Sequence, residues 1–277
     1  MAAVELHPDL IDFPGAFAPP VDLISVVNDL HTRHSEIVGL DQLSARAQGR
    51  PAEDVARTLR RKGWLSPLRT RGVWSFTPTL SPLHMGEFRE LRAWLLTHQE
   101  SGVCIAGKSA AQVHGWLRRP TAPTIGAPSE MRLPRSLDEY RVCRWDPNLS
   151  LDEVHGLPAW QPETLLVFMA ARPAQFSWDG ISDWLWELAS SVDTEMLVTE
   201  LYGRKRSVWM KTAHLVNESD SPELAAEIAA QAPATGHGPY QFGQRRAMDE
   251  RFGLPPRWVP EFEVMDYVLP TWWTARL

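Results

Sequence analysis

The sequence lacks the features of a secreted, disulfide-stabilised or membrane-spanning protein. Among 277 residues there are only two cysteines, Cys104 and Cys143, both within apolar stretches. This argues against a disulfide framework and against a cysteine-rich zinc site. The longest uninterrupted apolar run, Leu165 to Ala171, is far too short to cross a bilayer. The first twenty residues carry acidic groups and prolines in place of a basic region followed by an apolar one. We therefore expect a soluble, cytoplasmic protein with free core thiols.

Residue patterns typical of catalysis are also missing. Metal-dependent nucleases commonly place a carboxylate two residues before a strand lysine. In this sequence the four lysines are preceded at that offset by Arg60, Ala106, Gly203 and Trp209. No serine or cysteine has a convincing base partner. We expect no catalytic residue, no metal site and no cofactor.

One stretch, from Gly102 to Ser109, has the spacing of a phosphate-binding loop, G-x-x-x-x-G-K-S. In such a loop an apolar strand precedes the first glycine, and the four residues between the glycines wrap the phosphates with their amides. Here those four residues, Val103 to Ala106, are themselves the apolar strand, and a polar helix end precedes Gly102. No later apolar strand ends in an aspartate that could hold magnesium. The sequence therefore does not predict nucleotide binding at Lys108.

The chain does contain a compact basic segment within an otherwise acidic sequence. Its formal net charge is −6. Between Ser44 and Gly72, however, eight basic residues stand against two acidic ones, so this segment carries +6 and the remainder −12. An acidic protein with one basic island is typical of a DNA-binding module attached to another domain.

The hydrophobic period around this island predicts three helices followed by a hairpin. Residues 1–20 contain four prolines and no sustained period, which indicates a flexible arm. Helical spacing follows from Asp22 to His34, from Leu40 to Gln48 and from Pro51 to Lys62. The period then changes to that of strands, and Trp64 to Thr77 predicts a β-hairpin. Three helices closed by a hairpin indicate a winged helix-turn-helix at residues 21–82.

The third predicted helix separates its apolar and charged residues onto opposite sides. Its apolar side must pack on the first two helices, so its basic side is available to enter a major groove. Arginine suits this task because its planar fork can donate two hydrogen bonds to a guanine or a phosphate. Either Glu53 or Asp54 could accept a hydrogen bond from cytosine or hold the arginines in place. The hairpin tip, Arg69 to Gly72, should meet the DNA backbone or the minor groove and add affinity more than sequence choice.

The residues predicted to bind DNA share positive charge or a place beside it on these elements. They are Arg46, Arg50, Glu53, Arg57, Arg60, Arg61, Arg69 and Arg71.

Residues 83–277 are predicted to form a separate, larger domain of mixed α/β character. Its expected helices are Glu87–Gln99, Ser109–Trp116, Pro162–Ala171, Trp178–Val192, Asp193–Leu201 and Ser207–Val216. Its expected strands are Gly102–Ala106, Thr124–Ala127, Tyr140–Trp145 and Glu261–Leu269, with a long loop at Thr235–Pro256. Ser109 is expected to cap its helix.

Several short motifs together resemble one family. They are Leu59-Arg-Arg-Lys-Gly-Trp-Leu65, Gly72-Val-Trp-Ser-Phe76, Ala106-Gly-Lys-Ser-Ala-Ala111 leading to Gly115, Gly156-Leu-Pro158, Pro162-Glu-Thr-Leu-Leu166 and Arg172-Pro-Ala-Gln-Phe176. Across about residues 22 to 270, the chain resembles the AbiEi-type antitoxins, which are transcriptional regulators of type IV toxin–antitoxin systems.

The resemblance implies a DNA-binding N-terminal domain that represses its own operon by binding inverted repeats in its promoter. It also implies a C-terminal antitoxin domain that opposes a nucleotidyltransferase toxin encoded alongside, without requiring a stable complex with it. The leading hypothesis is therefore a non-enzymatic autorepressor and antitoxin. Two alternatives remain open: a DNA- or nucleotide-processing enzyme that uses the C-terminal domain, and a transcription factor that senses a small ligand.

Overall fold

The computed structural model describes residues 21–33, 35–47, 49–76, 86–118, 121–178, 180–243 and 256–268. In this part of the chain there are ten α-helices and three β-sheets, which confirms the mixed α/β class predicted from the sequence. None of the helices described is long and apolar enough to span a bilayer. The arm predicted at residues 1–20 lies outside the described residues.

The chain divides into two compact units. The first consists of residues 1–101 with Leu133–Glu139, and the second of Gly102–Arg132 with Tyr140–Leu277. Each unit has its own hydrophobic core.

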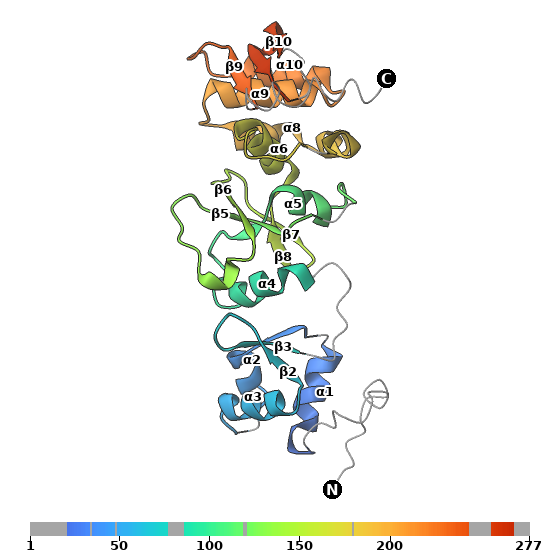
Figure 1. Cartoon of the computed structure of the whole chain (residues 1–277), viewed down its shortest axis with the longest axis vertical. Helices are drawn as coiled ribbons and strands as arrows, with labels where there is room; N and C mark the ends of the chain where they lie inside the picture. The colour runs from blue at the N-terminus through green and yellow to red at the C-terminus, as the bar shows by residue number, and fades with distance from the viewer. Residues whose placement is uncertain are drawn as a thin grey trace. The chain divides into compact units, whose positions relative to one another are not determined.

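The N-terminal unit begins with three helices and a small antiparallel sheet (Figure 1). The elements in chain order are α1 (Ile24–Thr32), β1 (Ile37–Gly39), α2 (Leu40–Ser44), α3 (Ala52–Arg61), β2 (Leu65–Pro67) and β3 (Val73–Phe76). The sheet has the order β1-β3-β2, with both pairings antiparallel. All three helices and the β2–β3 hairpin lie where the sequence period predicts them, whereas β1 was not predicted.

Helices and sheet share one core in this unit. Val27, Leu30, Val55 and Leu59 are 0% exposed, and Phe76 from β3 is 1% exposed. Burying each such side chain contributes about 1.5–3 kcal/mol, so this shared core fixes the hairpin against the helices.

A fourth helix packs on the opposite face of the same sheet. After η3 (Gly86–Phe88), α4 (Arg89–Leu95) buries Ala93 against Ile37 of β1 and Val73 of β3. The 3-10 turn η4 (Arg135–Leu137) lies against α4. The unit therefore continues past the boundary predicted near residue 82, because the outer face of the sheet is apolar and α4 covers it.

The C-terminal unit contains a five-stranded mixed sheet. Its strands are β4 (Cys104–Ile105), β5 (Thr124–Ala127), β6 (Arg141–Arg144), β7 (Asp152–Val154) and β8 (Leu157–Ala159). The order is β6-β5-β4-β8-β7, with parallel pairing at β5–β6 and β4–β8. The strands predicted around β4, β5 and β6 are present, whereas the β7–β8 hairpin was not predicted.

Six helices accompany this sheet. They are α5 (Gly107–Val113), α6 (Pro162–Ala171), α7 (Leu185–Ser190), α8 (Thr194–Leu201), α9 (Arg206–Asn217) and α10 (Pro222–Gln231). Every residue from 163 to 170 of α6 is buried, and α6 contacts α5, α7, α8 and α9. This helix is therefore the centre of the unit. The single helix predicted at Trp178–Val192 is instead η5 (Ile181–Asp183) followed by α7.

A second small sheet ends the described chain. It has the order β10-β11-β9, from β9 (Tyr240–Phe242), β10 (Arg257–Val259) and β11 (Val264–Asp266). The helices α9 and α10 lie side by side (Figure 1), and α9 also contacts β9 and β11. The strand predicted at Glu261–Leu269 is wrong in its first part, which is the 3-10 turn η6 (Pro260–Phe262). The loop predicted at Thr235–Pro256 contains β9, and its residues 244–255 lie outside the described residues.

Candidate nucleic-acid interface

Helix α3 presents one apolar and one charged side. Its buried residues are Ala52, Val55, Ala56 and Leu59. Its exposed residues are Glu53, Arg57, Arg60 and Arg61. Acidic residues occupy the first turn and basic residues the last, which matches the helix dipole. The helix ends at Arg61, and Gly63, just past the C-cap Lys62, has a φ of 80° that favours glycine.

The hairpin that follows α3 is closed by a tight tip. The N–H of Leu68 donates to the carbonyl of Val73 at 3.3 Å, and Gly72 has a φ of 77°. The carbonyl of Gly72 accepts from the N–H of Leu40 at 3.2 Å, which ties the tip to the start of α2. A Cβ at Gly72 would lie 3.1 Å from Leu40 Cδ1. Both the backbone angle and this close approach therefore require glycine at the tip.

Two open hollows lie between α3 and the hairpin. The first, of about 450 Å³, is lined by Glu53, Arg57 and Arg60 from α3 and by hairpin residues that include Arg71. The second, of about 570 Å³, is lined by Arg57, Arg60 and Arg61 and by Leu65 to Pro67 of β2. Both hollows share Arg57 and Arg60. We call the surface formed by Glu53, Arg57, Arg60, Arg61 and Arg71 the helix–hairpin groove.

Within the groove the charged side chains differ in their partners. Asp54 Oδ1 lies 2.8 Å from Arg57 Nη1, so this carboxylate orients the arginine from one turn earlier on α3. Arg60, Arg61 and Arg71 form no ion pair with any other residue that the structure describes. The groove therefore gathers four exposed arginines, three of which keep their charge available to a ligand.

The three other predicted arginines lie outside the groove. Arg46 has a side chain 19% exposed, pairs with Asp29 and donates to the carbonyl of Gln42 at 2.5 Å. The hydrogen bond from Arg46 is the main reason that the pKa of Asp29 lies below its usual value. Arg50 pairs with Asp22, and the pair is partly exposed.

The third of these arginines, Arg69, is at the hairpin tip but is engaged by two carboxylates. Its backbone N–H donates to Glu90 Oε2 at 3.0 Å and to Glu90 Oε1 at 3.2 Å. Its Nη2 lies 3.5 Å from Glu139 Oε2. Glu90 lies on α4, and Glu139 lies two residues after the end of η4. No local sequence pattern predicts that either residue lies near the tip.

The basic cluster Arg204-Lys205-Arg206, a second possible contact surface in the sequence, is largely internal to the C-terminal unit. Arg206 Nη2 lies 3.0 Å from Glu263 Oε1. Arg204 has a side chain 16% exposed, pairs with the fully buried Glu200 at 2.5 Å and lies over the Trp145 ring at 4.0 Å. Arg245 and Arg246, which form a further basic pair in the sequence, lie outside the described residues.

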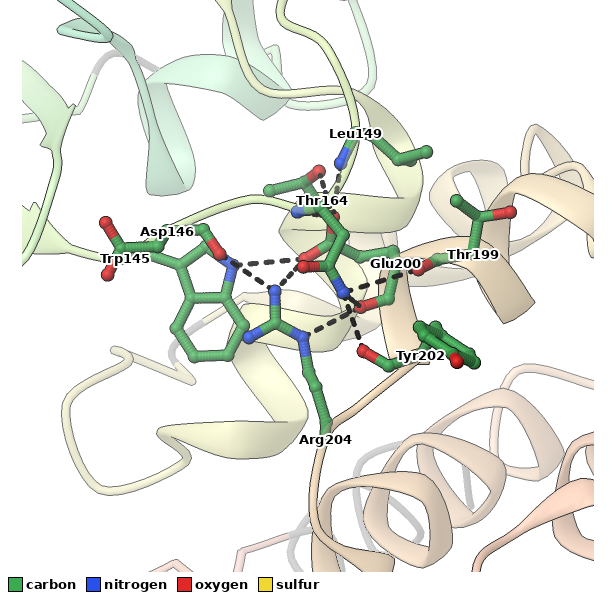
Figure 2. A network of polar contacts seen from close by, with 9 residues as sticks. Trp145, Asp146, Leu149, Thr164, Thr199, Glu200, Tyr202 and Arg204 are labelled. Atoms are coloured by element: carbon green, nitrogen blue, oxygen red, sulfur yellow. Dashed lines mark hydrogen bonds and ion pairs between the residues drawn. The ribbon is translucent and has the colours of Figure 1, made fainter.

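Glu200 is the centre of the polar network drawn in Figure 2. It accepts hydrogen bonds from Trp145 Nε1 at 3.2 Å, the Asn148 N–H at 2.8 Å, the Leu149 N–H at 3.1 Å and Thr164 Oγ1 at 3.3 Å, besides Arg204. The network joins the end of α8 to the segment after β6 and to α6. Because its donors satisfy a buried carboxylate, its role is to hold these elements together.

The stretch Gly102–Ser109, which has the spacing of a phosphate-binding loop, forms a strand and the start of a helix. The strand β4 lies between Gly102 and Gly107, as the sequence predicts, and α5 begins at Gly107. Ser109 was expected to cap this helix, and that expectation is wrong: Ala106 precedes the helix, and buried Ser109 Oγ instead accepts from the Thr124 N–H at 3.0 Å. Lys108 Nζ lies 5.9 Å from the centre of the Phe176 ring.

Comparison with known families gives a match for the middle part of the chain. Residues 102–218 match the family described as AbiEi antitoxin C-terminal domain. The match begins just before β4 and ends just after α9. Over this stretch the chain is similar to the C-terminal domain of AbiEi-type antitoxins, which confirms the family resemblance of the motifs between Ala106 and Phe176. This domain indicates an antitoxin role in a toxin–antitoxin system.

A solved structure is similar to nearly the whole chain. The crystal structure of the RV2827C protein from Mycobacterium tuberculosis is similar to this chain with a TM-score of 0.72 and 27% sequence identity. The similarity covers 94% of this chain and 96% of that one. No curated protein matches the chain.

Proposed function

We propose that the chain is a DNA-binding autorepressor and the antitoxin of a type IV toxin–antitoxin system. The observation that carries the DNA-binding part is the helix–hairpin groove, where four exposed arginines surround the space between α3 and the β2–β3 hairpin. The order of three helices and a hairpin is that of a winged helix-turn-helix, in which the last helix enters the major groove. In this proposal α3 is the recognition helix and the hairpin is the wing.

The residues of the groove divide between reading bases and holding the backbone. Arg57, which pairs with Asp54, would donate a bidentate pair of hydrogen bonds to a guanine. Because Asp54 is engaged with Arg57, Glu53 is the better candidate to accept from a cytosine amino group. Arg60, Arg61 and Arg71 would neutralise phosphates, which supplies affinity without sequence choice.

The net charge of the chain supports a polyanionic ligand at this surface. The protein is negative overall, so a duplex would be repelled by most of it and attracted only where the arginines gather. A groove with four arginines and one glutamate is also too polar for an ordinary protein interface, whose centre is depleted of charge.

The antitoxin part of the proposal rests on the matched domain at residues 102–218. We infer that the protein acts in the cytoplasm, where it binds inverted repeats in its own promoter. It also opposes a nucleotidyltransferase toxin that is encoded by the neighbouring gene. No stable complex between the two proteins is required, and the chain acts without catalysing a reaction. Repression and toxin neutralisation would then reside in different units.

A fluorescence anisotropy titration of the full chain with the duplex upstream of its operon tests the DNA-binding part. Arg57→Ala should weaken binding of this duplex by about 1–3 kcal/mol, with less effect on a scrambled duplex. Arg71→Ala should lower the slope of log Kd against log salt by about 0.9 with either duplex. The matched control is Arg141→Ala, which removes an exposed arginine from β6 in the C-terminal unit. Equal effects of all three substitutions would contradict the proposal.

Co-expression with the neighbouring gene tests the antitoxin part. A chain carrying both Arg57→Ala and Arg71→Ala should still rescue growth from the toxin while losing repression of a promoter reporter. Loss of rescue by this folded variant would show that the two activities are not separate, and failure of the wild-type chain to rescue would refute the antitoxin role.

A further inference from the structure

The two arginines of the hairpin tip lie in different surroundings. Arg71 lines the helix–hairpin groove. Arg69 has its guanidinium 3.5 Å from Glu139 and its backbone N–H held by Glu90. A wing would use both arginines on DNA, but one of them already has an anionic partner within the protein.

Glu139 reaches the tip through an unusual chain path. The segment Leu133–Glu139 belongs to the N-terminal unit, whereas the residues on both sides of it belong to the C-terminal unit. Leu137 within the segment is 1% exposed, so the segment is anchored by burial. The next residue after Glu139 is Tyr140, which directly precedes β6. Both ends of this segment therefore continue directly into the chain of the C-terminal unit, and its last residue lies beside the wing tip.

Glu90 has a different position. It lies on α4, whose Ala93 is fully buried against Ile37 and Val73 of the wing sheet. Both of its carboxylate oxygens accept from one backbone N–H, which a duplex cannot replace without moving the tip. Glu90 therefore fixes the backbone of the tip, and only the pair formed by Glu139 is open to exchange.

We infer that Glu139 is a latch that occupies Arg69 in the free protein and is displaced from it when a DNA phosphate binds. This inference rests on the proposed function, since it assigns a regulation to the tip of the proposed wing. The side chains of the pair are 54% and 41% exposed, and exposed pairs of this kind are weak. A phosphate offers stronger, charge-assisted hydrogen bonds to the same guanidinium.

The consequence is a coupling between the wing and the inserted segment. Duplex and Glu139 compete for one guanidinium, so DNA binding releases residues 133–139 from this contact. Coupling between two binding events is reciprocal. A change that strengthens the contact between Glu139 and Arg69 therefore weakens DNA binding by the factor by which bound DNA weakens this contact. The segment thus links occupancy of the operator to the chain of the antitoxin-type domain.

Titration of the full chain with the upstream duplex tests the latch. Glu139→Gln should bind about two- to five-fold tighter than the wild type, as expected for release of an exposed ion pair. Its slope of log Kd against log salt should stay close to that of the wild type, because Arg69 contacts the phosphate in both complexes. The matched control is Asp138→Asn, which removes the same charge from the adjacent exposed residue and leaves the pair with Arg69 intact.

A second background separates the latch from general electrostatics. In a chain that carries Arg69→Ala, adding Glu139→Gln should leave the affinity unchanged. The inference is overturned if Glu139→Gln and Asp138→Asn tighten binding equally, or if the gain persists without Arg69. Absence of duplex binding by every form, including the wild type, would instead refute the proposed function and the latch with it.

Discussion

Replacing Glu200 with alanine removes the acceptor on which five hydrogen bonds of the C-terminal unit converge. The donors are Trp145 Nε1, the backbone N–H groups of Asn148 and Leu149, Thr164 Oγ1 and Arg204 Nη2. Glu200 is 0% exposed and the Arg204 side chain only 16% exposed. Truncation therefore leaves a largely buried cation and two backbone donors without their acceptor.

The expected loss of stability follows from the burial of this pair. Removing one partner of a buried ion pair costs about 3–5 kcal/mol, because the remaining charge stays desolvated. Each orphaned neutral donor costs about 1–3 kcal/mol, although part of this overlaps with the first cost and part is recovered by water. We take about 4 kcal/mol as the net loss, a large fraction of the roughly 5–15 kcal/mol that stabilises a typical protein. For a unit of this size the midpoint should fall by about 8–16 °C.

Differential scanning calorimetry and urea unfolding of the full chain measure this loss. The matched control is Glu195→Ala, which removes an exposed glutamate from the same helix, α8, and should change stability by less than about 0.5 kcal/mol. If Glu200→Ala lowered the unfolding free energy by no more than the control, the network would not hold these elements together as described.

Three further changes test the C-terminal unit. Burial raises the pKa of Glu163, so ionisation of this carboxyl lowers the free energy of unfolding as pH rises from about 4.3 through the raised pKa. Glu163→Gln should therefore be more stable than the parent in urea unfolding at pH 7. A stability difference between the two that did not shrink toward pH 4 would contradict the assignment. Burial also raises the pKa of Cys104 to about 12 and of Cys143 to about 11, so iodoacetamide at pH 8 should modify neither thiol of the folded chain and both in urea, as read by mass spectrometry. Gly126→Ala would place a Cβ 2.9 Å from Trp160 Nε1 and should cost about 1–3 kcal/mol by thermal unfolding; an unchanged midpoint would show that the neighbours yield freely.

Elements with strong local patterns were predictable from the sequence. Helix α3 combines a clean apolar side with a basic side, and it is bounded by Pro51 and Gly63. Helix α6 and strand β5 were predicted with their observed bounds, because both are apolar runs between turn residues. These signals are contained in the segments themselves, so they do not depend on tertiary contacts.

Elements defined by distant partners were not predictable in this way. Strand β1 is only three residues long, and its partner β3 lies beyond α2, α3 and β2 in the chain. The β7–β8 hairpin is equally short, and its place in the sheet depends on the pairing of β8 with β4. Such strands carry too few residues to show a period, and their stability comes from the sheet that they join.

The candidate site likewise has features that local sequence predicts and features that depend on the tertiary fold. The sequence predicted that Arg57, Arg60 and Arg61 share the outward side of one helix, and the structure brings them together with Arg71. The sequence could not predict that Arg69 has an anionic neighbour, because Glu139 lies seventy residues further along the chain. Exposure of an arginine can be read from a helical period, but its partner depends on the tertiary fold.

Hydrogen–deuterium exchange of the full chain, with and without the duplex upstream of its operon, tests most directly where DNA binds. Exchange reports local protection segment by segment and does not depend on a substitution. We predict that peptides covering α3 and the β2–β3 hairpin, residues 52–76, take up deuterium more slowly with the duplex, whereas peptides from α9 and α10 do not change. Protection confined to the C-terminal unit, with residues 52–76 unaffected at saturating duplex, would contradict the assignment of the helix–hairpin groove as the DNA-binding surface.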